Sequence, residues 1–93
     1  MPGTVIDNAA GQRFELAVPG GIAFIDYRRE GTTLWLLHAE VPADLRGQGV
    51  GAQLVRATLE LVRSRGEQVI PVCGYVRSFI ARHAEFADLA HAP

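Results

Sequence analysis

The chain has 93 residues, of which 48% are hydrophobic and 20% are charged, and its formal net charge at pH 7 is −1. These values are typical of one small globular domain, here residues 1–93, and the near-neutral charge argues against a general binder of nucleic acid or of membrane surfaces. The single cysteine, Cys73, cannot form an internal disulfide, and the chain has neither a signal-peptide pattern nor an apolar run of the ~18 residues needed to cross a bilayer. We therefore expect a cytoplasmic protein.

The first half of the chain predicts an antiparallel meander. Residues 1–10 are small and polar, which predicts a loose lead-in. Apolar patterning then predicts three strands, over residues 13–18, 22–29 and 32–41, joined by turns at 19–21 and 30–31. The third strand contains Leu34-Trp35-Leu36-Leu37, which is apolar on both faces, so we expect it to be central and covered on both sides.

The second half predicts two helices separated by a strand. Apolar residues recur at helical spacing over 47–65, and Gly66 suits the C-terminus of that helix. A short strand is expected over 67–72 and a second helix over 74–86. In this β-β-β-α-β-α order, the third strand, the first helix and the fourth strand form a parallel crossover unit. The expected fold class is α/β (α+β), with a mixed central sheet and one helix on each face.

A glycine-rich segment, Arg46-Gly47-Gln48-Gly49-Val50-Gly51-Ala52, lies between a buried strand and an amphipathic helix. The first N–H groups of a helix lack partners and carry partial positive charge, so phosphate oxygens bind well there. Glycines at alternate positions let the backbone approach such an anion. A tight turn without a ligand is the alternative. However, three glycines in five residues are costly for a turn, because each weakens a helix by roughly 0.5–1 kcal/mol.

Two common phosphate motifs do not fit this segment. The Walker motif ends in Gly-Lys-Ser/Thr, where this chain has Gly51-Ala52. The dinucleotide pattern G-x-G-x-x-A is formally met by Gly47, Gly49 and Ala52, but that fold places its loop after a first parallel strand and needs further βαβ units.

The spacing Arg-x-x-Gly-x-Gly, at Arg46, Gly49 and Gly51, resembles the acyl-CoA pyrophosphate motif of the GNAT N-acetyltransferase superfamily. Further segments resemble a minimal, single-domain GNAT-like subfamily: His38-Ala39-Glu40-Val41-Pro42, Pro71-Val72-Cys73-Gly74-Tyr75-Val76 and the tail from Ala81 to Leu89. The resemblance covers roughly residues 12–90.

The resemblance implies that the cofactor is acetyl-CoA or coenzyme A. Its pantetheine arm would bind the main chain around Ala39–Val41, which includes Glu40 and Val41. Its pyrophosphate would bind the amides of Gly47, Gln48, Gly49, Val50, Gly51 and Ala52, with Arg46 beside the phosphates. Residues 46–65 contain four arginines and one glutamate, a local charge of +3 that weakly supports an anionic ligand.

Two residues are candidates for catalysis. Cys73 lies between a predicted strand and a predicted helix, where a helix N-terminus favours the thiolate, and the resemblance implies that the subfamily uses this cysteine. A small buried hydrophobic residue is the alternative. His38 is expected to share a strand face with Leu34, Leu36 and Glu40, where it can act as a general base or simply be hydrogen-bonded in the core. Glu40 is the second candidate base, Tyr75 is a candidate for lining the site, and no metal-ligand spacing is present.

The predicted function is acetyl-CoA-dependent transfer of an acetyl group to an amine, on a small molecule or a peptide, either through Cys73 or assisted by it. A non-catalytic CoA-binding or regulatory module and a purely structural domain are the alternatives. Ordinary GNAT enzymes have two acceptor-side helices after the first strand, whereas here only Pro19-Gly20-Gly21 connects the first two predicted strands. The acceptor site is therefore expected to be open or built by a partner, and the protein to be a monomer or a homodimer.

Overall fold

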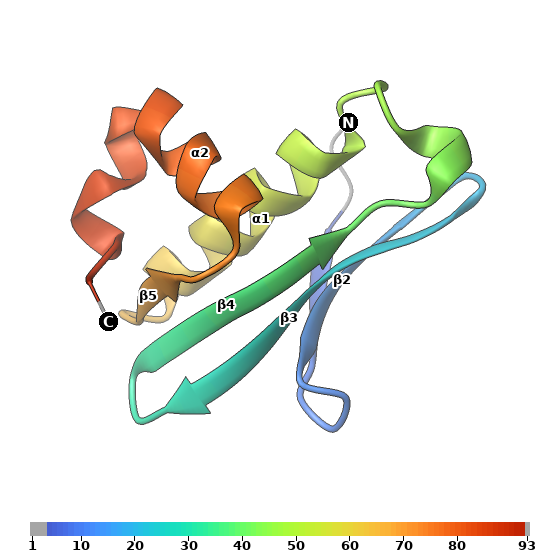
Figure 1. The fold of residues 1–93 in the computed structure, drawn as a ribbon. Helices are drawn as coiled ribbons and strands as arrows, with labels where there is room; N and C mark the ends of the chain where they lie inside the picture. The colour runs from blue at the N-terminus through green and yellow to red at the C-terminus, as the bar shows by residue number, and fades with distance from the viewer. Residues whose placement is uncertain (1–3, 93) are drawn as a thin grey trace.

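The computed structural model describes residues 4–92. It contains one five-stranded sheet in the order β1-β2-β3-β4-β5, two α-helices and two 3-10 helices (Figure 1). The bounds are β1 Val5–Asn8, β2 Arg13–Val18, β3 Gly21–Glu30, β4 Thr33–Glu40, η1 Ala43–Leu45, α1 Val50–Ser64, β5 Gln68–Pro71, α2 Gly74–Arg82 and η2 Ala84–Leu89. Strands β1 to β4 are antiparallel, and β5 is parallel to β4 after the α1 crossover. The mixed sheet of an α+β fold and the parallel crossover are confirmed.

The expectation of a loose lead-in over residues 1–10 is wrong for Val5–Asn8, and residues 1–3 lie outside the described part. Val5–Asn8 forms the edge strand β1, so the strand order begins β-β-β-β rather than β-β-β. Only Val5 is a buried apolar residue in this strand, too weak a pattern for a four-residue strand to be predicted. Residues 9–12 connect β1 to β2 without a helix.

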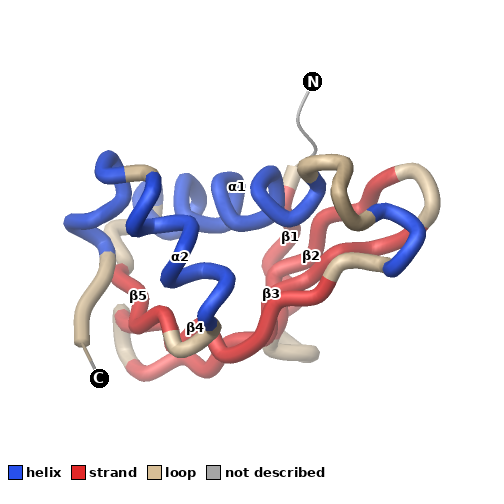
Figure 2. The backbone as a smooth tube through the Cα atoms, turned by 45° about the horizontal axis from the view of Figure 1, so that its top comes forward, coloured by secondary structure: helices blue, strands red, loops and turns tan. Residues whose placement is uncertain are grey.

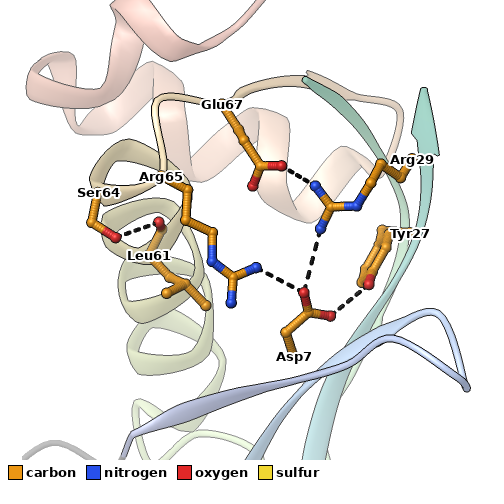
Figure 3. Close-up of polar contacts among 7 residues, drawn as sticks. All are labelled: Asp7, Tyr27, Arg29, Leu61, Ser64, Arg65 and Glu67. Atoms are coloured by element: carbon orange, nitrogen blue, oxygen red, sulfur yellow. Dashed lines mark hydrogen bonds and ion pairs between the residues drawn. The ribbon is translucent and has the colours of Figure 1, made fainter. Parts of the chain in front are cut away.

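Polar contacts hold β1 against the rest of the molecule (Figure 3). The carboxylate of Asp7 accepts hydrogen bonds from the Tyr27 hydroxyl at 2.5 Å, from Arg29 at 3.3 Å and from Arg65 at 2.8 Å. Arg29 also pairs with Glu67. We call these five residues the Asp7 network. It joins β1 to β3 and to the C-terminal end of α1.

Both helices pack on one face of the sheet, so the expectation of one helix on each face is wrong (Figure 2). Side chains of α1, α2 and η2 form one core with the inner-face residues of the strands. The opposite face is open in the described chain, and Ile6, Ile22 and Leu37 on it are exposed. Trp35, whose apolar character predicted a second covering layer, instead lies half-buried on this face and donates its indole N–H to Glu30 at 2.8 Å. We call this surface the open face.

Both predicted helices are shorter than expected. Helix α1 begins at Val50 rather than at residue 47, because Gly47 and Gly49 have φ angles of +82° and +78°. Helix α2 ends at Arg82, and the chain continues as η2. His83 closes α2: its ring hydrogen-bonds the carbonyl oxygen of Phe79 at 2.8 Å and stacks on the Phe79 ring at 3.9 Å.

Candidate functional site

A β-bulge in β4 decides which way its last side chains point. Leu36 is opposite Tyr27 and His38 is opposite Asp26, so Leu37 has no partner on β3. The extra residue reverses the in–out alternation of β4 beyond it. Ala39 consequently lies opposite the buried Ile25 and packs against the core.

His38 and Glu40 therefore lie on the open face, beside Phe24. The prediction that they share a face with each other is confirmed, but the prediction that they share one with Leu34 and Leu36 is wrong, because a bulge leaves no mark in the apolar pattern. The His38 Nε2 atom lies 3.2 Å from the Glu40 Oε2 atom, and the two side chains are 59% and 50% exposed.

Strands β4 and β5 separate at the middle of β4. Their pairing ends at Leu36 opposite Pro71, and the N–H of Cys73 then donates to the Leu36 carbonyl oxygen at 2.9 Å. Beyond this bond, no described strand pairs with the β5-side edge of β4. A cleft of about 550 Å³ opens along this edge, lined by His38, Ala39, Glu40, Val41, Leu45, Arg46, Gly47, Gly49, Val50, Gly51, Leu54 and Tyr75.

The glycine-rich loop lies at this cleft and presents unpaired backbone donors. Among described residues, none of the six successive N–H groups from Gly47 to Ala52 donates a hydrogen bond; the first helical bond runs from Gln53 to the Gly49 carbonyl oxygen at 3.0 Å. Gly47 and Gly49 have positive φ angles, and no atom lies within 4 Å of where their Cβ would stand. This combination of free N–H groups, open backbone and a helix N-terminus fits a phosphate or pyrophosphate group.

The third glycine serves a different purpose. Gly51 lies inside α1, and a Cβ on it would stand 2.5 Å from the Tyr75 hydroxyl oxygen. Gly51 therefore allows Tyr75, which is 46% exposed at the start of α2, to approach α1 and line the cleft.

The structure brings most predicted cofactor residues to the cleft: Glu40, Val41, Arg46, Gly47, Gly49, Val50 and Gly51. It does not bring Gln48 or Ala52 into the lining, although the N–H groups of both belong to the unpaired run. Leu45 and Leu54 line the cleft and were missed. The sequence marks Leu54 only as a core position of α1, and no pattern singles out Leu45.

Most of the positive charge of residues 46–65 lies away from the cleft, in ion pairs with carboxylates. Arg56, Arg63 and Arg65 pair with Glu85, Asp88 and Asp7, respectively, away from the cleft. Only Arg46 of the four arginines lines the cleft, where its Nε donates to the Val41 carbonyl oxygen at 3.3 Å. Any anion would therefore be held by backbone N–H groups and one guanidinium.

Cys73 lies at the point where the two strands separate. It is the N-cap residue of α2, it is partly buried against the core, and its thiol is free. It is absent from the cleft lining, whereas its bonding partner Leu36 is two residues before His38 on β4. The structure thus places Cys73 at the closed end of the strand separation and His38 at its open side.

Comparisons with known proteins agree with this architecture. A family model described as GCN5-related N-acetyl-transferase matches residues 13–89. A GCN5-like protein of Staphylococcus aureus, solved by NMR, has a similar fold, with a TM-score of 0.72 and 21% sequence identity over 99% of this chain and 91% of that chain. No helix among the described residues is long and apolar enough to cross a membrane. Because the family model matches most of its length, the chain belongs to the GCN5-related N-acetyltransferase family, whose members transfer acetyl groups to amines.

Proposed function

We propose that the chain binds acetyl-CoA along the cleft and transfers the acetyl group to an amine. The observation that carries the proposal is the run of unpaired N–H groups from Gly47 to Ala52 at the cleft, which suits the pyrophosphate of coenzyme A. Acetyl-CoA, when bound, supplies an activated acetyl thioester. The unpaired edge of β4 at Ala39–Val41 supports binding of the pantetheine arm, because its amides can pair with main-chain groups there as a neighbouring strand would.

The amine would approach from the open face. His38 and Glu40 line the cleft and also belong to that face, so they stand where the two meet. A neutral imidazole that donates Nε2–H to Glu40 keeps a lone pair on Nδ1, and this nitrogen can take the proton that the amine loses on attack. Glu40 then orients the His38 ring through this hydrogen bond. No helix follows β1 or β2 in the described chain, so the acceptor side stays open.

Cys73 supports a second route to the same products. Its thiol would take the acetyl group from the CoA thioester, with coenzyme A leaving as the free thiol, and would then pass the acetyl group to the amine and be restored as the thiol, or else it would assist deprotonation of the amine. Its position at the separation of β4 and β5 favours a role, whereas its absence from the cleft lining argues for direct transfer. Intact-protein and peptide mass spectrometry after incubation with acetyl-CoA separates the routes. Acetyl-Cys73 together with loss of amine acetylation in Cys73→Ser would support the cysteine route. The absence of both results would support direct transfer.

A non-catalytic CoA-binding module remains the competing function, and the open acceptor side is the observation that favours it. This alternative predicts binding of coenzyme A with no acetylation of any amine in a broad acceptor screen. The acetyltransferase proposal predicts at least one acetylated amine, with loss of turnover in His38→Gln.

The cofactor site is tested best with Gly49→Asn. Valine at this position would be strained by the positive φ whatever the ligand, but asparagine tolerates this conformation while placing a side chain where the anion would bind. Gly31→Asn is a matched control, since Gly31 has a φ of +61° and open surroundings in the β3–β4 turn. By calorimetry, we expect Gly49→Asn to weaken CoA binding by roughly tenfold or more and Gly31→Asn to leave it unchanged. Equal affinities would contradict the site.

A further inference from the structure

An apolar patch on the open face lies directly beside the proposed site. Trp35 of β4 and Ile70 of β5 are opposite each other in the parallel pairing, so their side chains share this face. Ile70 is only 8% exposed, yet it lies outside the core that the helices cover, which agrees with this placement. Leu37, the bulge residue, is 42% exposed and directly precedes His38. We call Trp35, Leu37 and Ile70 the apolar platform.

Opposite charges stand at the two ends of the apolar platform. Arg28 is exposed and lies directly opposite Trp35 on β3. It forms no ion pair with a described residue, and its neighbour Glu30 accepts a hydrogen bond from the Trp35 indole at 2.8 Å instead. At the other end, the carboxylate of Glu40 is 50% exposed beside the imidazole of His38. A guanidinium and a carboxylate therefore face solvent on either side of an apolar surface.

The spacing of these charges suits a small zwitterion. Arg28 and Asp26, the residue opposite His38, are two positions apart on β3, which is about 7 Å along a strand. Asp26 is itself paired with Arg13 at 3.3 Å, so the Glu40 carboxylate is the one that remains for an ammonium group. The long side chain of Arg28 can reach across this spacing, and its planar guanidinium binds a carboxylate through two parallel hydrogen bonds.

We propose that the acceptor is an apolar α-amino acid with a free carboxylate. Its amine would meet His38 and Glu40, its side chain would pack on the apolar platform, and its carboxylate would bind Arg28. Three side chains offer far less than the roughly 800 Å² that each partner buries in a stable protein complex, so the platform suits one side chain rather than a protein surface. This inference rests on the proposed function, because His38 is the base that the amine must reach.

The choice of amine tests this assignment. Acetylation would be measured with leucine, with 3-methylbutylamine, which lacks the carboxylate, and with alanine, which lacks most of the side chain. We expect Arg28→Gln to lower kcat/KM for leucine roughly tenfold and to change kcat/KM for 3-methylbutylamine by less than about twofold. The unmodified protein should favour leucine over alanine by roughly tenfold, and Leu37→Ala should narrow this preference. Arg82→Gln is the matched control and should change none of these values, since Arg82 is exposed at the end of α2 and forms no ion pair with a described residue.

Trp35 reports binding independently of turnover, because it is the only tryptophan of the chain and belongs to the apolar platform. With coenzyme A present, leucine should change the emission of Trp35, and Arg28→Gln should need roughly tenfold more leucine for the same change.

Several results would overturn the acceptor assignment alone. They are equal losses of kcat/KM for leucine and 3-methylbutylamine in Arg28→Gln, no loss for either, or Trp35 emission that leucine leaves unchanged. Emission that varies with protein concentration would also overturn it, because a second copy would then cover the platform. If no amine is acetylated in a broad acceptor screen, the proposed function fails, and this inference fails with it.

Discussion

The Asp7 network makes a quantitative prediction about stability. The Asp7 side chain is only 11% exposed, and its carboxylate accepts hydrogen bonds from two arginines and a tyrosine. Asp7→Asn removes the anion and turns N–H donors toward the guanidinium groups. A hydrogen bond to a charged group contributes about 1.5–3 kcal/mol, but Arg29 and Arg65 are 35% and 40% exposed, so water replaces part of what each loses. We expect a loss of about 2 kcal/mol from a total of roughly 5–14 kcal/mol for a domain of this length.

Urea unfolding followed by Trp35 fluorescence measures this loss. With a slope of about 1–2 kcal/mol per molar urea, the midpoint for Asp7→Asn should fall by about 1–2 M. Asp88→Asn is the matched control, because it removes an aspartate that also pairs with an arginine but is 64% exposed. Exposed pairs contribute little, so its midpoint should scarcely move. Equal midpoint changes for the two variants would refute the reasoning.

The same network predicts a pH dependence. Burial raises the pKa of Asp7, but the hydrogen bonds from Tyr27 and Arg65 and the charges of Arg65 and Arg29 outweigh this effect, so the pKa lies below the usual 3.8. A carboxyl with a lowered folded-state pKa contributes stability that is fully present above its unfolded-state pKa and is lost as the pH falls through the folded-state pKa. The difference in unfolding free energy between the unmodified protein and Asp7→Asn should therefore narrow below about pH 4. A constant difference down to pH 2 would contradict this explanation.

Three further predictions concern single positions. Thr58 is fully buried and its hydroxyl has no hydrogen-bond partner among described residues, so Thr58→Val should raise the free energy of unfolding by about 1 kcal/mol in urea. Gly51→Ala should stabilise the protein by about 1 kcal/mol only when Tyr75→Ala removes the ring that its Cβ would meet, and thermal unfolding of the single and double variants would detect this coupling. Deletion of Leu37 should remove the bulge and leave Ala39 opposite Ile25, because Leu37 has no partner on β3, so CoA binding in calorimetry should persist and the urea midpoint should change little.

The sequence predicted the elements with strong periodicity. The apolar stripe over 47–65 indicated α1, and the turns at 19–21 and 30–31 indicated the meander, so the parallel β4–α1–β5 crossover followed. Strand β1 was not predicted, because it is stabilised by pairing with β2 and by the contacts of Asp7, and neither of these appears as an apolar pattern in the sequence. The open face was missed because Trp35 and Leu37 are apolar, and apolar character does not reveal whether a second layer covers a side chain.

In the candidate site, too, the sequence predicted some features and missed others. The glycine motif predicted that the cofactor residues lie at one loop. The strand pattern predicted an inward-facing His38, because regular in–out alternation was assumed. A one-residue bulge at Leu37 moves His38 and Glu40 to the open face, where an amine can reach them from outside the helical layer. This matters for the acceptor, because the same two residues also line the cleft. The orientation of the proposed base thus depends on the pairing of β3 with β4, a long-range property that a local pattern does not encode.

The three glycines of the loop are alike in the sequence but not in the structure. Gly47 and Gly49 are required by positive φ angles that turn successive N–H groups outward, whereas Gly51 is required by the approach of Tyr75. Counting glycines therefore overstates the support for a phosphate site, since only two of them shape the backbone that would bind it. The stronger argument is that six successive N–H groups stay unpaired beside the cleft. A turn without a ligand accounts for the glycines, but it gives no reason for a cleft beside those donors.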